Sequence, residues 1–533
     1  MQQATDIHEP LFRKWLPAWF ITTALILCII PSVMLLGLFN SNVAFASSFL
    51  DVEAEDLQFL FLITYGTLAA TMLIENRFFH YFPTRNYMVL FICGNIVVLF
   101  ITTQVHNYYL LTFLRFLQGV FMVVGPSAFL QLLFVRIKHR SARLIGYSVY
   151  YAALLMSGTF TLHLVTWSLD RYGWQEMLYA TMAIYIAVLF IVLLVFNPHR
   201  HLPRYPLYQI DFTGFLFLMV TLLSGSFVLV YGRKLYWFQS VHINIALVVF
   251  LFSSGLFIAR QLTVKRPLYH FEVLKFGNFR IGILLFIVFY ILRAGLNNVY
   301  ATMYAVWHWE FAYIVQVQYI NVAGIALAIL TSSYLLYREV VIKYLLAIGF
   351  TVLAVQFAWF ALLFNSDCSI QQLAVPLFLQ GFGTGFIFTP LVIFIVSSVP
   401  QHLASMASVS ALASRFWATG IGFAIVQNAQ YILQRKHYLW LQQYLTPDSY
   451  LWATRYDNTV NTFTAKGYPV VQAGQVAVKQ LNAAVEAQSF LLSNMEIYTA
   501  MAAVALAVAL LLMLNANITG VVATLKNRVW GVG

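Results

Sequence analysis

The chain has 533 residues, of which 61% are hydrophobic and only 9% are charged. A soluble domain carries about 25% charged residues, and this composition also excludes disordered, collagen-like, coiled-coil and disulfide-framework proteins. The net charge of +12 does not indicate nucleic-acid binding, because polytopic membrane proteins carry excess Lys and Arg on cytoplasmic loops.

Apolar runs bounded by polar turns predict fourteen helices that cross the lipid bilayer. Each run is long enough for a hydrocarbon core of about 30 Å, and backbone groups in lipid must be satisfied within the helix. The first run is longer than the apolar region of a signal peptide, about 7–15 residues, so we expect it in the mature protein. The expected spans are 15–39, 57–76, 86–104, 108–135, 142–168, 175–196, 212–231, 242–261, 279–305, 313–335, 344–364, 370–398, 405–433 and 497–519.

The basic residues predict the orientation. An even number of spans places both termini on one side, and 19 of the 30 Lys and Arg residues lie in the loops and termini of that side. The short loops on the other side hold three. Because short cytoplasmic loops are enriched in Lys and Arg, we expect both termini in the cytoplasm. Three arginines remain inside spans: Arg115, Arg293 and Arg415.

The spans predict three parts. Residues 1–196 form an N-terminal six-helix bundle, 197–278 a linker with two inserted spans, and 279–533 a C-terminal six-helix bundle. Such paired blocks are typical of transporters built from repeats. The last part includes a polar outer loop at 434–496, within which we expect a helix over Val476–Leu492. A segment this long is expected to be a docking or lid element.

Six motifs carry a family resemblance. The most specific is Leu111–Gly119 with Arg115 and Gln118, followed by Gly125 and Pro126. The others are Asp211–Gly214 with Tyr231–Ser240, Arg266–Phe279, Gln380–Pro390, Ala407–Gly422 and Gln488–Glu496. Together they resemble the fourteen-span drug:proton antiporter branch of the major facilitator superfamily, of the EmrB/QacA type. The resemblance covers nearly the whole chain and implies the major facilitator fold, an all-α polytopic membrane protein with helices arranged 6 + 2 + 6.

Three segments depart from the family pattern. The aspartate expected before the Asn42-Val43-Ala44 run falls on Gly37, and the proline-containing antiporter motif is reduced to Ser157–His163 with one glycine. The loop motif after the second span is reduced to Glu75–Arg77 and Thr84–Arg85. The resemblance therefore implies the fold more strongly than it implies proton-coupled drug efflux.

Arg115 is the leading candidate site residue, because an arginine inside a membrane is costly unless it is paired or hydrated. Three interpretations stay open. Arg115 is held structurally by carbonyls and by polar groups such as Asn40 and Gln118, or it faces the cavity and binds a carboxylate or phosphate, or it pairs with an acidic residue placed nearby by a different span register.

Each further candidate has two open interpretations. Arg415 either contributes to the substrate site or acts in gating and packing between helices. Arg293, Asn297, Asn298 and Gln316 line a polar pathway or join helices. His163 titrates or is a neutral, hydrogen-bonded residue. The aromatic residues line a cavity or pack the bundle: Tyr150, Tyr151, Phe416 and Trp417. The family's gating and motif positions match Gly119, Gly125, Pro126, Arg77 and Arg85.

These observations predict a transporter that exports an amphipathic small molecule by alternating access. The resemblance implies a bacterial inner membrane, a periplasmic adaptor of the HlyD/EmrA type that contacts 434–496, and an outer-membrane channel. The alternatives are a member that moves an anionic or lipid-like metabolite without standard proton antiport, a non-transporting scaffold, and a membrane enzyme that uses His163. No sequence motif predicts a cofactor, a metal site or ATP as the energy source.

Overall fold

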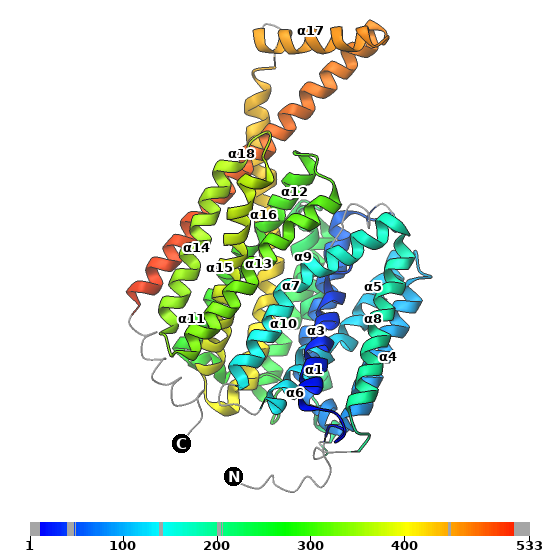
Figure 1. Cartoon of the computed structure of the whole chain (residues 1–533), viewed down its shortest axis with the longest axis vertical. Coiled ribbons are helices and arrows are strands. Elements are labelled where there is room, and N and C mark those ends of the chain that lie inside the picture. The colour runs from blue at the N-terminus through cyan, green and yellow to red at the C-terminus, as the bar shows by residue number, and fades with distance from the viewer. Residues whose placement is uncertain are drawn as a thin grey trace.

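The computed structural model describes residues 11–39, 47, 50–137, 142–199, 204, 206–445 and 449–515. Within these residues the regular structure is helical, apart from one isolated bridge between Phe12 and Phe196. Fourteen helical segments are long and apolar enough to cross a membrane, and they form one bundle (Figure 1). The prediction of an all-α protein with fourteen spans is confirmed.

The helices of the bundle follow the order of the predicted spans. They are α1 (Ala18–Gly37), α3 (Ala54–Tyr81), α4 (Thr84–Thr102), α5 (Tyr108–Phe121), α6 (Leu130–Arg136), α7 (Ala142–Arg171), α8 (Trp174–Val195), α9 (Phe212–Tyr231), α10 (Val241–Thr263), α11 (Gly277–Ala294), α12 (Leu296–Ala305), α13 (Phe311–Tyr337), α14 (Ile342–Leu363), α15 (Ile370–Ser397), α16 (Ala404–Gln442) and α18 (Val470–Leu514). The division of the chain at 196 and 278 stays a prediction.

Two predicted spans are interrupted helices. The fourth span consists of α5, the 3-10 turn η1 (Met122–Val124), the π-helical turn η2 (Gly125–Phe129) and α6. Pro126 lies in η2, where its missing N–H and its ring disturb the helical ladder. The ninth span breaks at Gly295 between α11 and α12, and the carbonyl of Gly295 accepts a hydrogen bond from Tyr498 at 2.6 Å.

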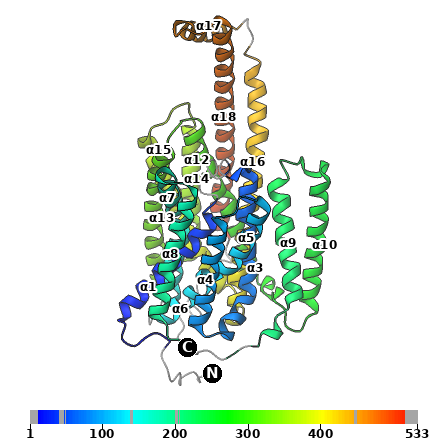
Figure 2. The same cartoon turned by 90° about the vertical axis from the view of Figure 1, so that its right-hand side faces the viewer.

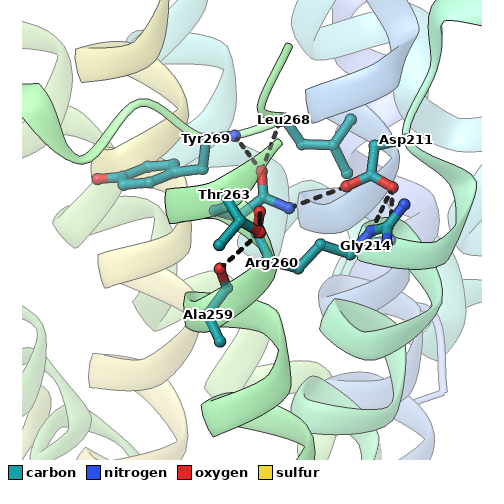
Figure 3. A network of polar contacts seen from close by, with 8 residues as sticks. Asp211, Gly214, Ala259, Arg260, Thr263, Leu268 and Tyr269 are labelled. Carbon is teal, nitrogen blue, oxygen red and sulfur yellow. Dashed lines mark hydrogen bonds and ion pairs between the residues drawn. The ribbon is translucent and has the colours of Figure 1, made fainter. Parts of the chain in front are cut away.

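The inserted helices α9 and α10 lie to one side of the bundle (Figure 2). At the end of the bundle opposite α17, Asp211 caps α9 and accepts hydrogen bonds from Arg260 Nε at 2.7 Å and Gln261 Nε2 at 3.2 Å (Figure 3). The side-chain Oε1 of Gln261 accepts a hydrogen bond from the backbone N–H of Tyr269 at 3.2 Å, and the Tyr269 hydroxyl lies 2.7 Å from that of Ser410 on α16. A network of hydrogen bonds therefore links α9 and α10 to α16 through Tyr269.

At the other end, the loop between α9 and α10 joins α3 to α16. Arg233 forms an ion pair with Glu55 of α3 at 2.7 Å, and its guanidinium lies 5.9 Å from the ring centre of Tyr431 on α16. Trp237 also donates to Asn428 of α16 at 3.4 Å. We call these five residues the outer clamp.

Helices α16 and α18 are longer than predicted. At about 1.5 Å per residue, their 39 and 45 residues exceed a hydrocarbon core of about 30 Å. Their outer parts project from the bundle and carry α17 (Tyr450–Ala465), which lies across the top (Figures 1 and 2). Both helices run past the expected span limits at 433 and 497, since α16 continues to Gln442 and α18 begins at Val470. We call residues 434–496 the stalk; the predicted helix over Val476–Leu492 lies within α18.

Gly119 allows α5 to approach α3 closely. A Cβ atom at this position would lie 2.4 Å from the carbonyl oxygen of Thr64 and 2.8 Å from the Cβ of Thr67. We expect Gly119→Ala to lower the free energy of unfolding by about 1–3 kcal/mol, because backbone must move to make room. Thermal unfolding of the purified protein measures this effect. Gly158→Ala is the matched control, since no atom lies within 4 Å of its added Cβ, and equal unfolding temperatures of the two variants would contradict the prediction.

Candidate functional site

Arg115 is held by the end of α1. Its side chain is 1% exposed, and its guanidinium donates to the carbonyls of Leu35 at 3.4 Å and Leu36 at 3.2 Å and to the side chain of Gln118. The guanidinium carbon also lies 4.8 Å from the ring centre of Phe39. Carbonyls in the last turn of a helix lack helical partners and carry partial negative charge. They therefore stabilise the guanidinium charge in place of a carboxylate.

These contacts support the first of the three interpretations of Arg115. The carbonyls and Gln118 are its partners, and no carboxylate contacts it in the described part of the chain. Asn40, the other expected partner, lies outside the described residues.

The other two span arginines meet in the middle of the bundle. Arg293 comes from the end of α11, just before the break at Gly295, and Arg415 comes from α16. The Arg415 guanidinium carbon lies 5.2 Å from the ring centre of Tyr65 on α3 and 5.5 Å from that of Tyr290 on α11. The Arg293 guanidinium carbon lies 5.9 Å from the ring centre of Tyr290. We call Tyr65, Tyr290, Arg293 and Arg415 the arginine-tyrosine cluster.

The cluster contains buried polar groups. In the described part of the chain, Nε of Arg415 and the hydroxyls of Tyr65 and Tyr290 are buried without a hydrogen bond of normal geometry. Among the same residues, neither guanidinium group contacts a carboxylate. Two positive charges therefore lie at one tyrosine ring with no counter-ion from these residues.

Aromatic residues surround the cluster. Phe416 packs edge-on against Tyr65, with ring centres 5.7 Å apart. Tyr151 on α7 packs against Phe388 on α15 at 4.8 Å, and Phe388 lies 6.0 Å from Tyr290. Of the other two predicted aromatic candidates, Tyr150 contacts Tyr151 edge-on, and Trp417 packs against Phe250 of α10. The rings thus form an apolar wall from both sides of the bundle.

The predicted polar candidates occupy different places. Asn298 joins helices, because its side-chain amide donates to Asn494 at 2.9 Å on α18 and to Gln430 at 3.3 Å on α16. Three others have exposed side chains: His163, Asn297 and Gln316. His163 lies beside Tyr319 of α13, with ring centres 5.7 Å apart. The roles of these three stay predictions.

The predicted motif residues lie at helix contacts and helix ends. Gly119 and Gly125 allow close helix approach, because a Cβ at Gly125 would lie 1.9 Å from the Ser32 hydroxyl. Arg77 donates to Gln209 at 2.9 Å, and Arg85 is half-buried at the start of α4.

The comparisons with known proteins agree with this architecture. The model of the Major Facilitator Superfamily matches residues 25–425. The chain belongs to the Major Facilitator Superfamily. It is a multi-pass membrane transporter, as the sequence predicts.

Curated relatives of this chain carry the name "Multidrug export protein EmrB". That of Escherichia coli K12 is 25% identical over 355 residues, which are 63% of this chain and 65% of the relative, so the match spans less than two thirds of that protein. That of Haemophilus influenzae is 24% identical over 249 residues, which are 45% of this chain and 47% of the relative.

Solved structures share the fold. A proton-dependent oligopeptide transporter aligns with a TM-score of 0.60 at 13% identity, over 96% of this chain and all of that one. The human organic anion transporter MFSD10 aligns with a TM-score of 0.51 at 12% identity, over 77% of this chain and 93% of that one. At such identities the likeness concerns the fold alone.

Arg115 is expected to be structural. Arg115→Ala leaves two helix-end carbonyls and Gln118 without their donor, so we expect a loss of about 2–4 kcal/mol in the free energy of unfolding. Thermal unfolding of the purified variant tests this. A variant with normal stability that has lost ligand binding would instead place Arg115 in the substrate site.

Proposed function

We propose that this transporter exports an amphipathic small molecule by alternating access, and that the anionic group of this molecule binds between Arg293 and Arg415. We further propose that it does so in a bacterial inner membrane with both termini in the cytoplasm, as the distribution of Lys and Arg predicts. The observation that carries the proposal is the arginine-tyrosine cluster, with two guanidinium groups at one tyrosine ring and no carboxylate among their described contacts.

Electrostatics favours an anion at this place. Two like charges in a medium of low dielectric repel each other and lack hydration, and an anion relieves both costs. A guanidinium binds carboxylate or phosphate through two parallel hydrogen bonds, and a tyrosine hydroxyl adds a donor. The aromatic wall suits an apolar body next to that anionic group. A cation would find no matching charge in this cluster.

The origin of the cluster's residues suits alternating access. Tyr65 comes from α3 in the first predicted block, while Arg293 and Arg415 come from α11 and α16 in the last. A ligand between them contacts both blocks, and transporters built from repeats bind substrates at this kind of interface. The name of the relatives, multidrug export protein EmrB, supports export rather than uptake.

Substitution of the pair tests the proposal. We expect Arg415→Ala and Arg293→Ala each to weaken binding of dodecanoate roughly 10- to 100-fold, the value of one lost charge-assisted hydrogen bond. Binding of dodecylamine, which has the same apolar chain and the opposite charge, should not weaken. Radioligand binding to the purified full chain measures the affinity for each compound. Uptake of the compounds into liposomes that contain the protein measures transport.

Arg338→Ala is the matched control for these variants. Arg338 also places its guanidinium carbon 5.2 Å from a tyrosine ring centre, that of Tyr334, but at the exposed end of α13. Its removal should leave dodecanoate binding unchanged. A wild-type protein that prefers the amine to the carboxylate would contradict an anion site.

We also propose that the stalk binds a periplasmic adaptor of the HlyD/EmrA type, through which the transporter joins an outer-membrane channel. Two features of the stalk support this. It projects beyond the bundle, and its tip exposes large apolar side chains, with Tyr450 81% exposed. The other exposed large apolar residues of the stalk include Leu439, Trp440, Tyr444, Val470 and Val471. Exposed apolar groups that cluster are typical of protein–protein contacts.

Deletion of residues 440–485 tests the adaptor contact. The deletion removes the tip and should abolish co-purification of the adaptor while binding of dodecanoate persists, because all four residues of the arginine-tyrosine cluster lie outside the deleted segment, and Arg415 lies 25 residues before it on α16. Full adaptor capture by the shortened chain would rule out the stalk as the docking site.

A further inference from the structure

A carboxyl group is buried between α3, α4 and η2. The Glu75 side chain is 2% exposed, and its Oε1 accepts a hydrogen bond from the Tyr87 hydroxyl at 2.9 Å. The Ser127 hydroxyl is also close to this carboxyl group. Buried carboxylates in proteins are normally paired with a cation, so Glu75 needs a different explanation.

The Ser127 hydroxyl has an informative partner. It donates its hydrogen to the carbonyl of Val123 at 2.8 Å, and while it does so its oxygen can accept a hydrogen bond from Glu75. Tyr87 already donates to one carboxyl oxygen of Glu75. A protonated carboxyl group matches both neighbours, because one oxygen accepts from Tyr87 and the other carries a proton to donate to Ser127.

No charged side chain compensates Glu75 in the described part of the chain. The helices packed against α3 include α1, α4, α5, α9 and α16, with the short turns η1, η2 and η3 (Leu207–Gln209). Of these, α1, α9 and the three turns carry no charged residue within their bounds. The charged or basic groups on α3 itself and on its neighbours α4, α5 and α16 are Glu55, Asp56, Arg77, His80, Arg85, Arg115, Arg415, Arg435, Lys436 and His437.

We propose that Glu75 is a proton-binding site that controls the packing of α3 against α4 and the break in the fourth span. With the proton bound, the neutral carboxyl group stays in the dry contact between Tyr87 and Ser127. When the proton leaves to water, the carboxylate requires hydration, so the contact between α3, α4 and η2 loosens. The step transfers one proton between a carboxyl oxygen and water and requires no other reactant.

The same helix carries this change to the arginine-tyrosine cluster. Tyr65 and Glu75 are ten residues apart on α3, which corresponds to about 15 Å along a helix. Ser127 follows Pro126 in η2, so the carboxyl group also contacts the interruption of the span whose other half holds Arg115. Proton loss at Glu75 therefore shifts Tyr65 relative to Arg415. The proposal rests on transport by alternating access but not on the identity of the substrate.

Difference infrared spectroscopy of the purified full chain, without any substrate, tests proton binding directly. Between about pH 5 and about pH 9, the wild type should lose the carbonyl stretch of a protonated carboxyl group. Glu75→Gln should lack that change. Glu310→Gln is the matched control, because Glu310 is an exposed residue that precedes α13, and it should keep the change. A band that persists in Glu75→Gln would overturn the proposal.

Hydrogen–deuterium exchange tests the conformational part. After correction for the intrinsic effect of pH, wild-type peptides that cover the end of α3 and the start of α4 should exchange faster at the higher pH, and those of Glu75→Gln should not respond. An equal response in both proteins would overturn the proposed link to packing. Both measurements are made without ligand. Their results therefore do not depend on whether dodecanoate binds at Arg415, and the failure of one proposal can be told apart from the failure of the other.

Discussion

An arginine in the interior of a membrane protein must find its partners within the bundle, since lipid offers none. This protein meets that constraint in two ways. Arg115 takes the carbonyls at the end of α1 and Gln118, so its charge is used to hold helices together. Arg293 and Arg415 lie against the ring of Tyr290 instead, and no carboxylate contacts them in the described part of the chain. This contrast is the basis of our proposal that Arg115 holds the fold while the other two arginines bind an anion.

The interruptions in two spans lie next to charged or titratable side chains. The break at Gly295 follows Arg293 closely, and the carbonyl exposed there is bound by Tyr498 of α18. The break at Gly125 and Pro126 brings Ser127 beside Glu75. In both cases a helix gives up regular hydrogen bonds where a charged or titratable side chain requires a particular position. Interrupted helices at a polar site are common in transporters.

Much of the fold could be predicted from the sequence, because hydrophobic length alone determines where a helix crosses a bilayer. The helix breaks were missed, since Gly295 lies within an apolar run that looks continuous. The polar stalk was expected to be mainly loop, yet α16 and α18 run through most of it. For the site, Arg293 and Arg415 stand out as charges within spans, whereas Tyr65 and Tyr290 resemble the other tyrosines of a chain that has 31. Their role depends on contacts between distant helices, which no local pattern contains.

Through the outer clamp, the loop between the inserted helices α9 and α10 restrains the separation of α3 and α16. Arg233 contacts α3 through Glu55 and α16 through Tyr431, so any movement that separates the outer ends of these two helices must stretch one contact or the other. Partly exposed ion pairs are worth only about 0–1 kcal/mol, and salt screens them over about 8 Å at physiological ionic strength. The ion pair between Arg233 and Glu55 therefore weakens as the salt concentration at this end of the bundle rises, and separating the ends of α3 and α16 then costs less free energy.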